Sequence, residues 1–276
     1  MPPSASARAL LDEIYDMYAE KRLGSSEDCK KCADLPFWRK DGCDARIGPV
    51  PIYHVGNAYA EAKKKIVFAA SVGYGWDSEF AAVKNCGTVE EWKDRLEAAR
   101  NSNPAGIRAA WFQLDYAALS GSERDKLINI MHDAQQSLYE DARISIYRAL
   151  KEVCSRLYGK ESGFENIALL NLIHCNDGGK DRSKLPAGIP GFCCNKQEAD
   201  NNYWFARTLA ILKPDIVVTM CTTRDYWILR QPFIKEEPYG DAVGPFEGHP
   251  DLRGRMRFEQ YIQMLLEFIE QRQRLP

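Results

Sequence analysis

Three short apolar runs constrain the fold of this chain more than any other feature of its sequence. They are Lys65–Ser71 (KIVFAAS), residues 166–173 (NIALLNLI) and Ile216–Met220 (IVVTM), and Gly73 and Gly75 follow the first run. Runs of this length without regularly alternating polar residues are typical of strands that are buried on both faces of a parallel sheet. We therefore expect a central, mainly parallel sheet.

Segments with apolar residues at helical spacing separate these runs. Helical patterns cover residues 7–22, most of 88–160, and 197–212, with breaks near 101–104 and 120–123. Strands that alternate with helices through right-handed crossovers form an α/β fold, with helices on both faces of the sheet. The sequence thus predicts a single three-layer α/β domain over residues 1–276, with its site at the carboxyl ends of the strands.

The composition is that of a folded protein. The chain has 276 residues, of which 45% are hydrophobic and 11% aromatic, so it can bury a large core. No stretch approaches the roughly 20 apolar residues that span a bilayer. We expect a soluble, cytoplasmic protein (nuclear in a eukaryote) without a membrane partner. The net charge is only −2, so a nucleic acid would have to be bound by local basic patches.

Cysteine is the residue type that points most clearly to a bound group. The chain has nine cysteines, and an odd number favours buried thiols or metal ligands over disulfides. Cys29 and Cys32 form a CxxC pair, Cys175 follows the second apolar run, and Cys193 and Cys194 come later. Four sulfur ligands divided in this way can hold an iron–sulfur cluster or a structural metal.

A closed zinc site is the main alternative to a cluster. Cys43 and His54 follow the CxxC pair, and the set Cys29, Cys32, Cys43 and His54 has the composition of a tetrahedral zinc site. Redox catalysis is disfavoured because no strand precedes the CxxC pair, as it does in thioredoxin-like proteins. The same thiols can also lie near the surface without any ligand.

The order of these segments resembles that of the iron–sulfur uracil-DNA glycosylases of the uracil-DNA glycosylase superfamily. That order is CxxC, then LLNLIHC at a strand end, a Pro/Gly/Lys-rich loop with further cysteines, LAILKPDIVVTM, and finally GHPDLRGRMRFEQYIQMLLEFI. The likeness covers roughly residues 25–75 and 140–270. It implies a uracil-DNA glycosylase-like α/β fold in which the segment around 88–140 is a helical insertion.

The resemblance also implies a metal centre. A [4Fe–4S] cluster would be held by Cys29, Cys32, Cys175 and one of Cys193 and Cys194. Zinc remains the alternative occupant. Where the family has its fourth cysteine at the start of a helix, this chain has Asn201 or Asn202.

The activity that the resemblance implies is DNA repair by excision of uracil or another damaged base. His249 of the His249-Pro250 motif would face a flipped base, and Asn171 matches the asparagine of the family's central strand. The water-activating loop falls on residues 68–76, where Ser71 stands near the position of an acidic residue and Asp77 follows. The catalytic candidates are therefore His249, Asn171, Ser71 and Asp77.

Base excision also needs groups that hold the base and the phosphates. Tyr74 and Trp76, beside two glycines, suit stacking on a base, and Asn171 suits a pyrimidine edge. Two basic segments suit phosphate contacts, and single-stranded or mismatched DNA is the expected partner. The basic residues are Arg253, Arg255, Arg257, Lys180, Arg182 and Lys184.

Structural roles stay open for the same residues. His249 can cap a helix whose first turn carries the arginines, Asn171 can bond to loop backbone, and Tyr74 and Trp76 can fill the core. Two other functions stay open as well. Ser71 in place of an acid indicates a non-catalytic nucleic-acid-binding relative, and Cys43 indicates a zinc-stabilised scaffold.

Overall fold

The structure of the protein is a computed structural model. It describes residues 2–20, 39–40, 43–44, 53–72, 94, 117, 119–142, 145–159, 163–173, 204–220, 243–244 and 257–273.

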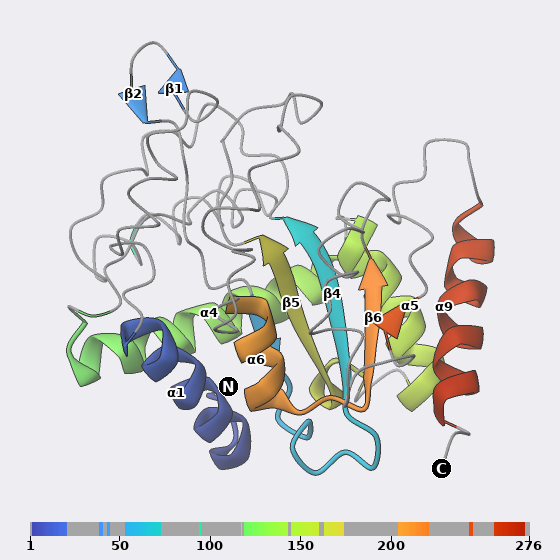
Figure 1. The fold of residues 1–276 in the computed structure, drawn as a ribbon. Coiled ribbons are helices and arrows are strands. Elements are labelled where there is room, and N and C mark those ends of the chain that lie inside the picture. The colour runs from blue at the N-terminus through green and yellow to red at the C-terminus, as the bar shows by residue number, and fades with distance from the viewer. Residues whose placement is uncertain are drawn as a thin grey trace.

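A five-stranded sheet with the order β3-β5-β4-β6-β7 lies at the centre of the fold (Figure 1). β4 pairs in parallel with β5 and β6, β7 is parallel to β6, and β3 is antiparallel to β5. A separate ladder joins β1 and β2. The strands are β1 (Arg39–Lys40), β2 (Cys43–Asp44), β3 (Tyr53–Val55), β4 (Ile66–Val72), β5 (Ile167–Ile173), β6 (Ile216–Met220) and β7 (Val243–Gly244).

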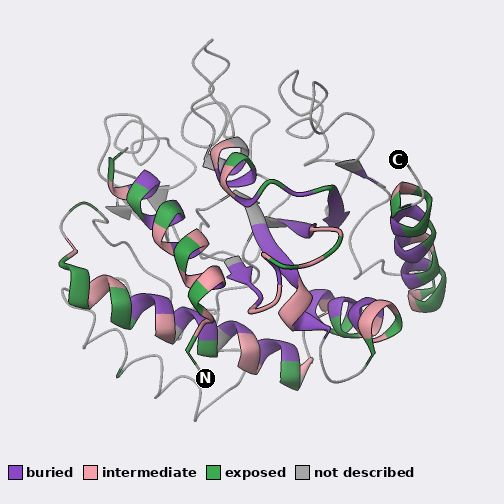
Figure 2. Cartoon of the chain, turned by 90° about the horizontal axis from the view of Figure 1, so that it is seen from below, coloured by how far each residue is buried: buried purple, intermediate pink, exposed green. Residues whose placement is uncertain are grey.

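The central strands are apolar because both of their faces are covered. All five residues of β6 are buried, and Ile66, Val67 and Phe68 of β4 have no exposed surface. Figure 2 shows this buried sheet between helices whose outer sides are exposed. The continuous apolar runs of the sequence therefore correctly predicted buried parallel strands.

Five helices surround the sheet in the part of the chain that the structure describes. α6 lies on one face, while α4 and α5 lie on the other (Figures 1 and 2). α1 packs on α6 and β3, and α9 packs on α5 and β6. The helices are α1 (Ala5–Glu20), α4 (Gly121–Asp141), α5 (Ser145–Tyr158), α6 (Trp204–Leu212) and α9 (Phe258–Gln273), and a short 3-10 helix, η4 (Phe164–Asn166), precedes β5.

Helix α4 begins with a capping box. The Ser120 hydroxyl accepts a hydrogen bond from the Glu123 backbone N–H at 3.4 Å, and the Ser120 N–H donates to a Glu123 carboxylate oxygen at 2.8 Å. The helix ends where Ala142 adopts a left-handed conformation with φ of 50°. The pattern of apolar residues runs from Leu127 to Leu157 without a break, so the division into α4 and α5 at this alanine corrects the single helical stretch predicted there.

The turn after β3 fixes this strand to the start of β5. The Gly56 N–H donates to Ile167 O at 2.9 Å, and the Asn57 N–H donates to a Glu165 carboxylate oxygen at 2.9 Å. A Cβ atom on Gly56 would lie 2.2 Å from the carbonyl oxygen of Glu165, so only glycine allows this approach. Asn57 also accepts from the Ser4 N–H at 2.6 Å, which anchors the start of α1.

The α/β class and the three central strands confirm the sequence-based prediction to within one residue at each end. β3, β7 and the ladder of β1 and β2 were not predicted. The helix predicted for 197–212 is described from Trp204 onward, and its earlier residues lie outside the described part.

Candidate functional site at the carboxyl edge of the sheet

The parallel strands bring two predicted site segments to one edge. β4, β5 and β6 run in the same direction and end at Val72, Ile173 and Met220, the edge to which their arrows point in Figure 1. In an open α/β sheet, the loops that leave this edge form the usual ligand site. Ser71 and Asn171 lie within β4 and β5, and Tyr74, Trp76 and Asp77 follow β4 in the sequence.

Ser71 and Asn171 occupy neighbouring strands close to this edge. Ala70 of β4 is the register partner of Asn171 in β5, and Ser71 is the next residue of β4. Adjacent strands lie about 5 Å apart, so the backbones of Ser71 and Asn171 are close neighbours. These two residues, 100 positions apart in the chain, are thus brought together by strand pairing.

The antiparallel strand β3, which follows the early cysteines in the sequence, enters the sheet from the same edge. Tyr53, its first residue, pairs with Leu170, and its last residue, Val55, pairs with Ala168. The chain therefore enters β3 from the carboxyl side of the sheet, beside the middle of β5, and Cys175 comes two residues after Ile173 in the sequence. Figure 1 also places β2, which contains Cys43, on the side to which the arrows of β4 and β5 point.

Most of the predicted site residues lie outside the described residues. Ser71 and Asn171 are described as strand residues, and Arg257 is an exposed residue just before α9. Because α9 begins at Phe258, Arg257 precedes the helix and is not part of its first turn. Outside the described part are Cys29, Cys32, Tyr74, Trp76, Asp77, Cys175, Lys180, Arg182, Lys184, Cys193, Cys194, His249, Arg253 and Arg255.

His54 of the alternative zinc site lies in a stack of buried rings. Its imidazole is 3.7 Å from the Phe164 ring, centroid to centroid, and 5.6 Å from the imidazole of His132. Tyr139 stacks on Phe164 as well, with 4.1 Å between the two ring centroids. These rings come from β3, α4 and η4, so the stack joins three elements across the β3 side of the sheet.

The hydrogen bond of His54 defines its tautomer. Its Nε2 lies 2.9 Å from the backbone oxygen of Phe164, and because a carbonyl only accepts, Nε2 must carry the proton. Nδ1 then has a lone pair, and it is buried without a hydrogen-bond partner among the residues that the structure describes. Burial lowers the pKa of His54 to about 3, and burial also lowers the pKa of His132. A histidine bonded in this way at one nitrogen is prepared to bind a ligand at the other.

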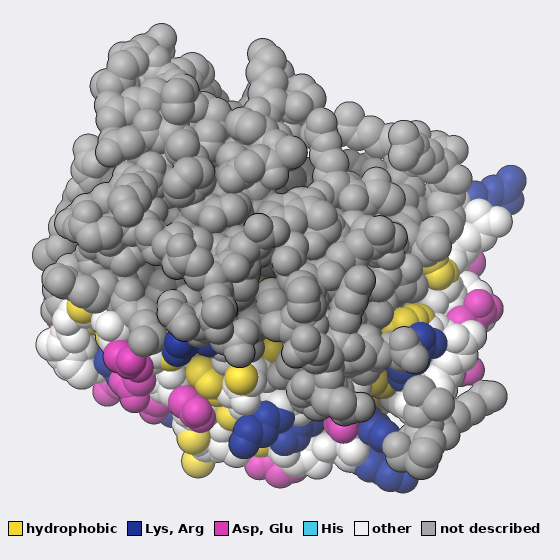
Figure 3. All heavy atoms as spheres, in the orientation of Figure 1, with side chains coloured by type: hydrophobic (Ala, Val, Ile, Leu, Met, Phe, Trp, Pro, Cys, Tyr) yellow, Lys and Arg dark blue, Asp and Glu magenta, His cyan; other side chains and the backbone are white. Residues whose placement is uncertain are grey.

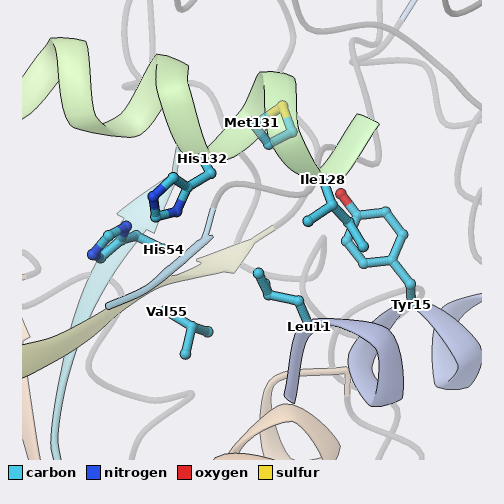
Figure 4. A pocket seen from close by; sticks show the side chains of 7 residues that line it. All are labelled: Leu11, Tyr15, His54, Val55, Ile128, Met131 and His132. Atoms are coloured by element: carbon cyan, nitrogen blue, oxygen red, sulfur yellow. The ribbon is translucent and has the colours of Figure 1, made fainter. Parts of the chain in front are cut away.

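A small cavity adjoins this histidine pair. It is about 10 Å³ in volume, which is room for about one water molecule. Figure 4 shows His54 and His132 side by side at one end of the cavity and Tyr15 at the other. Leu11, Val55, Ile128 and Met131 complete its lining. It is far too small for a substrate, since ligand pockets measure about 300 Å³ or more.

Neither His132 nor the ring stack was predicted from the sequence. His132 is separated from His54 by 78 positions, and its neighbourhood depends on the pairing of β3 with β5 and on the packing of α4 against β3. No local pattern marks such a contact. His54 itself was singled out only as a possible zinc ligand.

The residues that the structure describes contain no group of three or more His, Cys, Asp or Glu side chains able to hold a metal ion. Among the described helices, none is both long enough and apolar enough to cross a bilayer. Comparisons with protein-family models, curated proteins and solved structures give no match to this chain.

Proposed function

We propose that this protein is a DNA glycosylase that hydrolyses the N-glycosidic bond of uracil or another damaged base. The observation that carries the proposal is the register of β4 and β5, which sets Ser71 next to Asn171 where two loops leave the sheet. One of these loops continues to Tyr74, Trp76 and Asp77. The segments that the family resemblance assigns to water activation and base binding therefore leave the fold side by side.

The chemistry of base excision gives each candidate residue a role. Cleavage passes through an oxocarbenium-like state, so charge builds up on the departing base. His249 would donate a hydrogen bond to the base as this charge develops, and Asn171 would hold its polar edge. Asp77 or Ser71 would position the attacking water. Tyr74 and Trp76 would stack on the extruded base.

The cysteines fit a metal centre at the same edge. A CxxC pair with one later cysteine at a strand end and another in the next loop supplies the four thiolates that a [4Fe–4S] cluster requires. The antiparallel direction of β3 is compatible with this assignment, because β3, which the early cysteines precede in the sequence, enters the sheet from the carboxyl side.

Two specific observations favour other functions. Ser71 lies within strand β4, where an acid would be expected for water activation, and this favours a nucleic-acid-binding relative without catalysis. The unpartnered Nδ1 of His54 favours zinc, with Cys43 as a further ligand. Both alternatives predict the absence of base excision, so the activity of His249 variants separates them from the main proposal.

The test is a comparison of wild type with His249→Ala on single-stranded and mismatched DNA that contains uracil. Wild type should produce abasic sites, and the variant should be slower by roughly 10²–10³-fold, as when one transition-state donor is removed. Its affinity for DNA should barely change. Equal rates would exclude His249 from the mechanism, and no excision of any damaged base despite salt-sensitive binding would favour the non-catalytic alternative.

A further inference from the structure

An arginine on α5 that was not singled out from the sequence lies over the ring of the first residue of α9. The guanidinium carbon of Arg148 lies 4.2 Å from the centroid of the Phe258 ring. Phe258 is the first residue of α9, and Arg257, also exposed, immediately precedes it. Figure 1 shows that α9 begins on the side of the sheet to which the strand arrows point. The stacked guanidinium is therefore on the same side as the proposed site.

The nearby carboxylates do not neutralise Arg148. Glu152 is four residues from both Arg148 and Arg156, and it pairs with Arg156 at 2.7 Å. Glu259 of α9 also pairs with Arg156, at 2.8 Å. The side chain of Arg148 has no hydrogen bond or ion pair with the residues that the structure describes. Among these residues it makes a cation–π contact with the Phe258 ring.

A guanidinium in this position is suited to a phosphate group. Stacking on an aromatic face leaves the N–H groups at the edge of the guanidinium free, and these match two phosphate oxygens at once. The ring also restricts the side chain before binding, so less rotational freedom is lost when a contact forms. Arg257 provides a second cation beside it, since its side chain has no hydrogen bond or ion pair with the residues that the structure describes. Only its backbone is bonded there: the N–H donates to the Gln260 side chain at 3.1 Å, and the carbonyl accepts from the Tyr261 N–H at 3.1 Å.

Arg148 and Arg257 differ from other basic residues by their position more than by the charge around them. In the face shown in Figure 3, the described acidic and basic side chains are interspersed. Arg272 provides an internal comparison, because it stacks on Phe268 at 4.4 Å near the other end of the same helix. Arg148 and Arg272 make the same kind of ring contact, but Arg148 contacts the start of α9 and Arg272 lies near its end.

We propose that Arg148, stacked on Phe258, contacts a backbone phosphate of bound DNA beside Arg257. This inference rests on the proposed function, since it names a further contact to the same nucleic acid. Arg148 would position the strand and would read no base, because phosphate contacts carry no sequence information.

The experiment measures the affinity of a fluorescein-labelled single-stranded oligonucleotide containing one deoxyuridine, by anisotropy at several salt concentrations. The proteins are wild type, Arg148→Gln and the matched control Arg272→Gln. One lost phosphate contact should reduce the salt slope by about 0.7 to 0.9 in log units. The affinity ratio of wild type to Arg148→Gln should therefore be about threefold larger at about 50 mM than at about 200 mM salt.

The outcomes separate this inference from the proposed function. A reduced slope in Arg148→Gln with a wild-type slope in Arg272→Gln supports the contact. Unchanged slopes in both variants, or equal reductions in both, would overturn it while leaving DNA binding intact. Absence of salt-sensitive binding by wild type would overturn both proposals. Thermal unfolding is the check on folding, and a fall in Tm of more than about 2 °C with an unchanged slope would assign Arg148 a structural role only.

Discussion

Burial keeps His54 uncharged at pH values where an exposed histidine would accept a proton. Its pKa of about 3 in the folded chain lies below the ordinary value of 6.5. The unfolded chain then binds a proton that the folded chain does not, so stability is fully present above the ordinary pKa and falls as the pH drops toward 3. His132 shifts in the same direction, which adds to the loss.

This linkage gives a prediction for wild type and His54→Phe. From about pH 7 to about pH 5, His54 alone should lower the free energy of unfolding by about 2 kcal/mol. Phenylalanine keeps the ring stack with Phe164 but cannot titrate, so the pH dependence of the variant should be shallower. Urea denaturation at several pH values measures both. The same slope in wild type and variant would show that His54 is not the group that titrates.

At the scale of elements, the start of α4 depends on two side chains. The reciprocal bonds of Ser120 and Glu123 satisfy backbone donors that a helix leaves free at its first turn. Ser120→Ala should lower the free energy of unfolding by about 1 kcal/mol, with an unchanged urea m value. Ser137→Ala, toward the other end of the same helix, is the control and should be neutral or slightly stabilising. An equal loss in both variants would argue against a capping effect.

The elements also show which parts of the fold local sequence can specify. The buried strands were predicted from their continuous apolar runs, and most helices from apolar residues at helical spacing. β3 has only three residues, and its pairing partner Leu170 is 117 positions from Tyr53, so neither its presence nor its direction has a local signal. Ala142 was missed for a different reason: a single left-handed residue can end a helix without changing the apolar pattern on either side.

The candidate site was predictable in the same uneven way. The sequence predicts it at the carboxyl edge, because a parallel sheet has only one such edge, and the register of β4 and β5 shows that the backbones of Ser71 and Asn171 are neighbours there. The free state of Arg148 was not predictable, because Glu152 stands four residues from two arginines and the choice between them depends on Glu259, on another helix. Which arginine pairs with Glu152 therefore depends on how α5 packs against α9.

For the whole molecule, the cysteines predict a visible property. The purified protein should be brown, with a broad absorption band that bleaches on reduction, because thiolates bound to iron absorb by charge transfer. Cys175→Ala should lose the metal and much of the stability, since binding free energy contributes to folding. Cys154→Ala is the control, because this buried thiol is free and should not affect metal content. A colourless protein with stoichiometric zinc would instead identify the zinc alternative.

The positions of the chain ends have a practical consequence. Figure 1 places the start of α1 and the end of α9 beyond the tails of the strand arrows, away from the proposed site. Ser4 is held there by Asn57, and α9 continues to Gln273. An affinity tag, a fluorophore or a surface tether joined at either end would therefore extend away from the edge where the substrate is expected. The protein could be immobilised through either end with its proposed site still facing the solution.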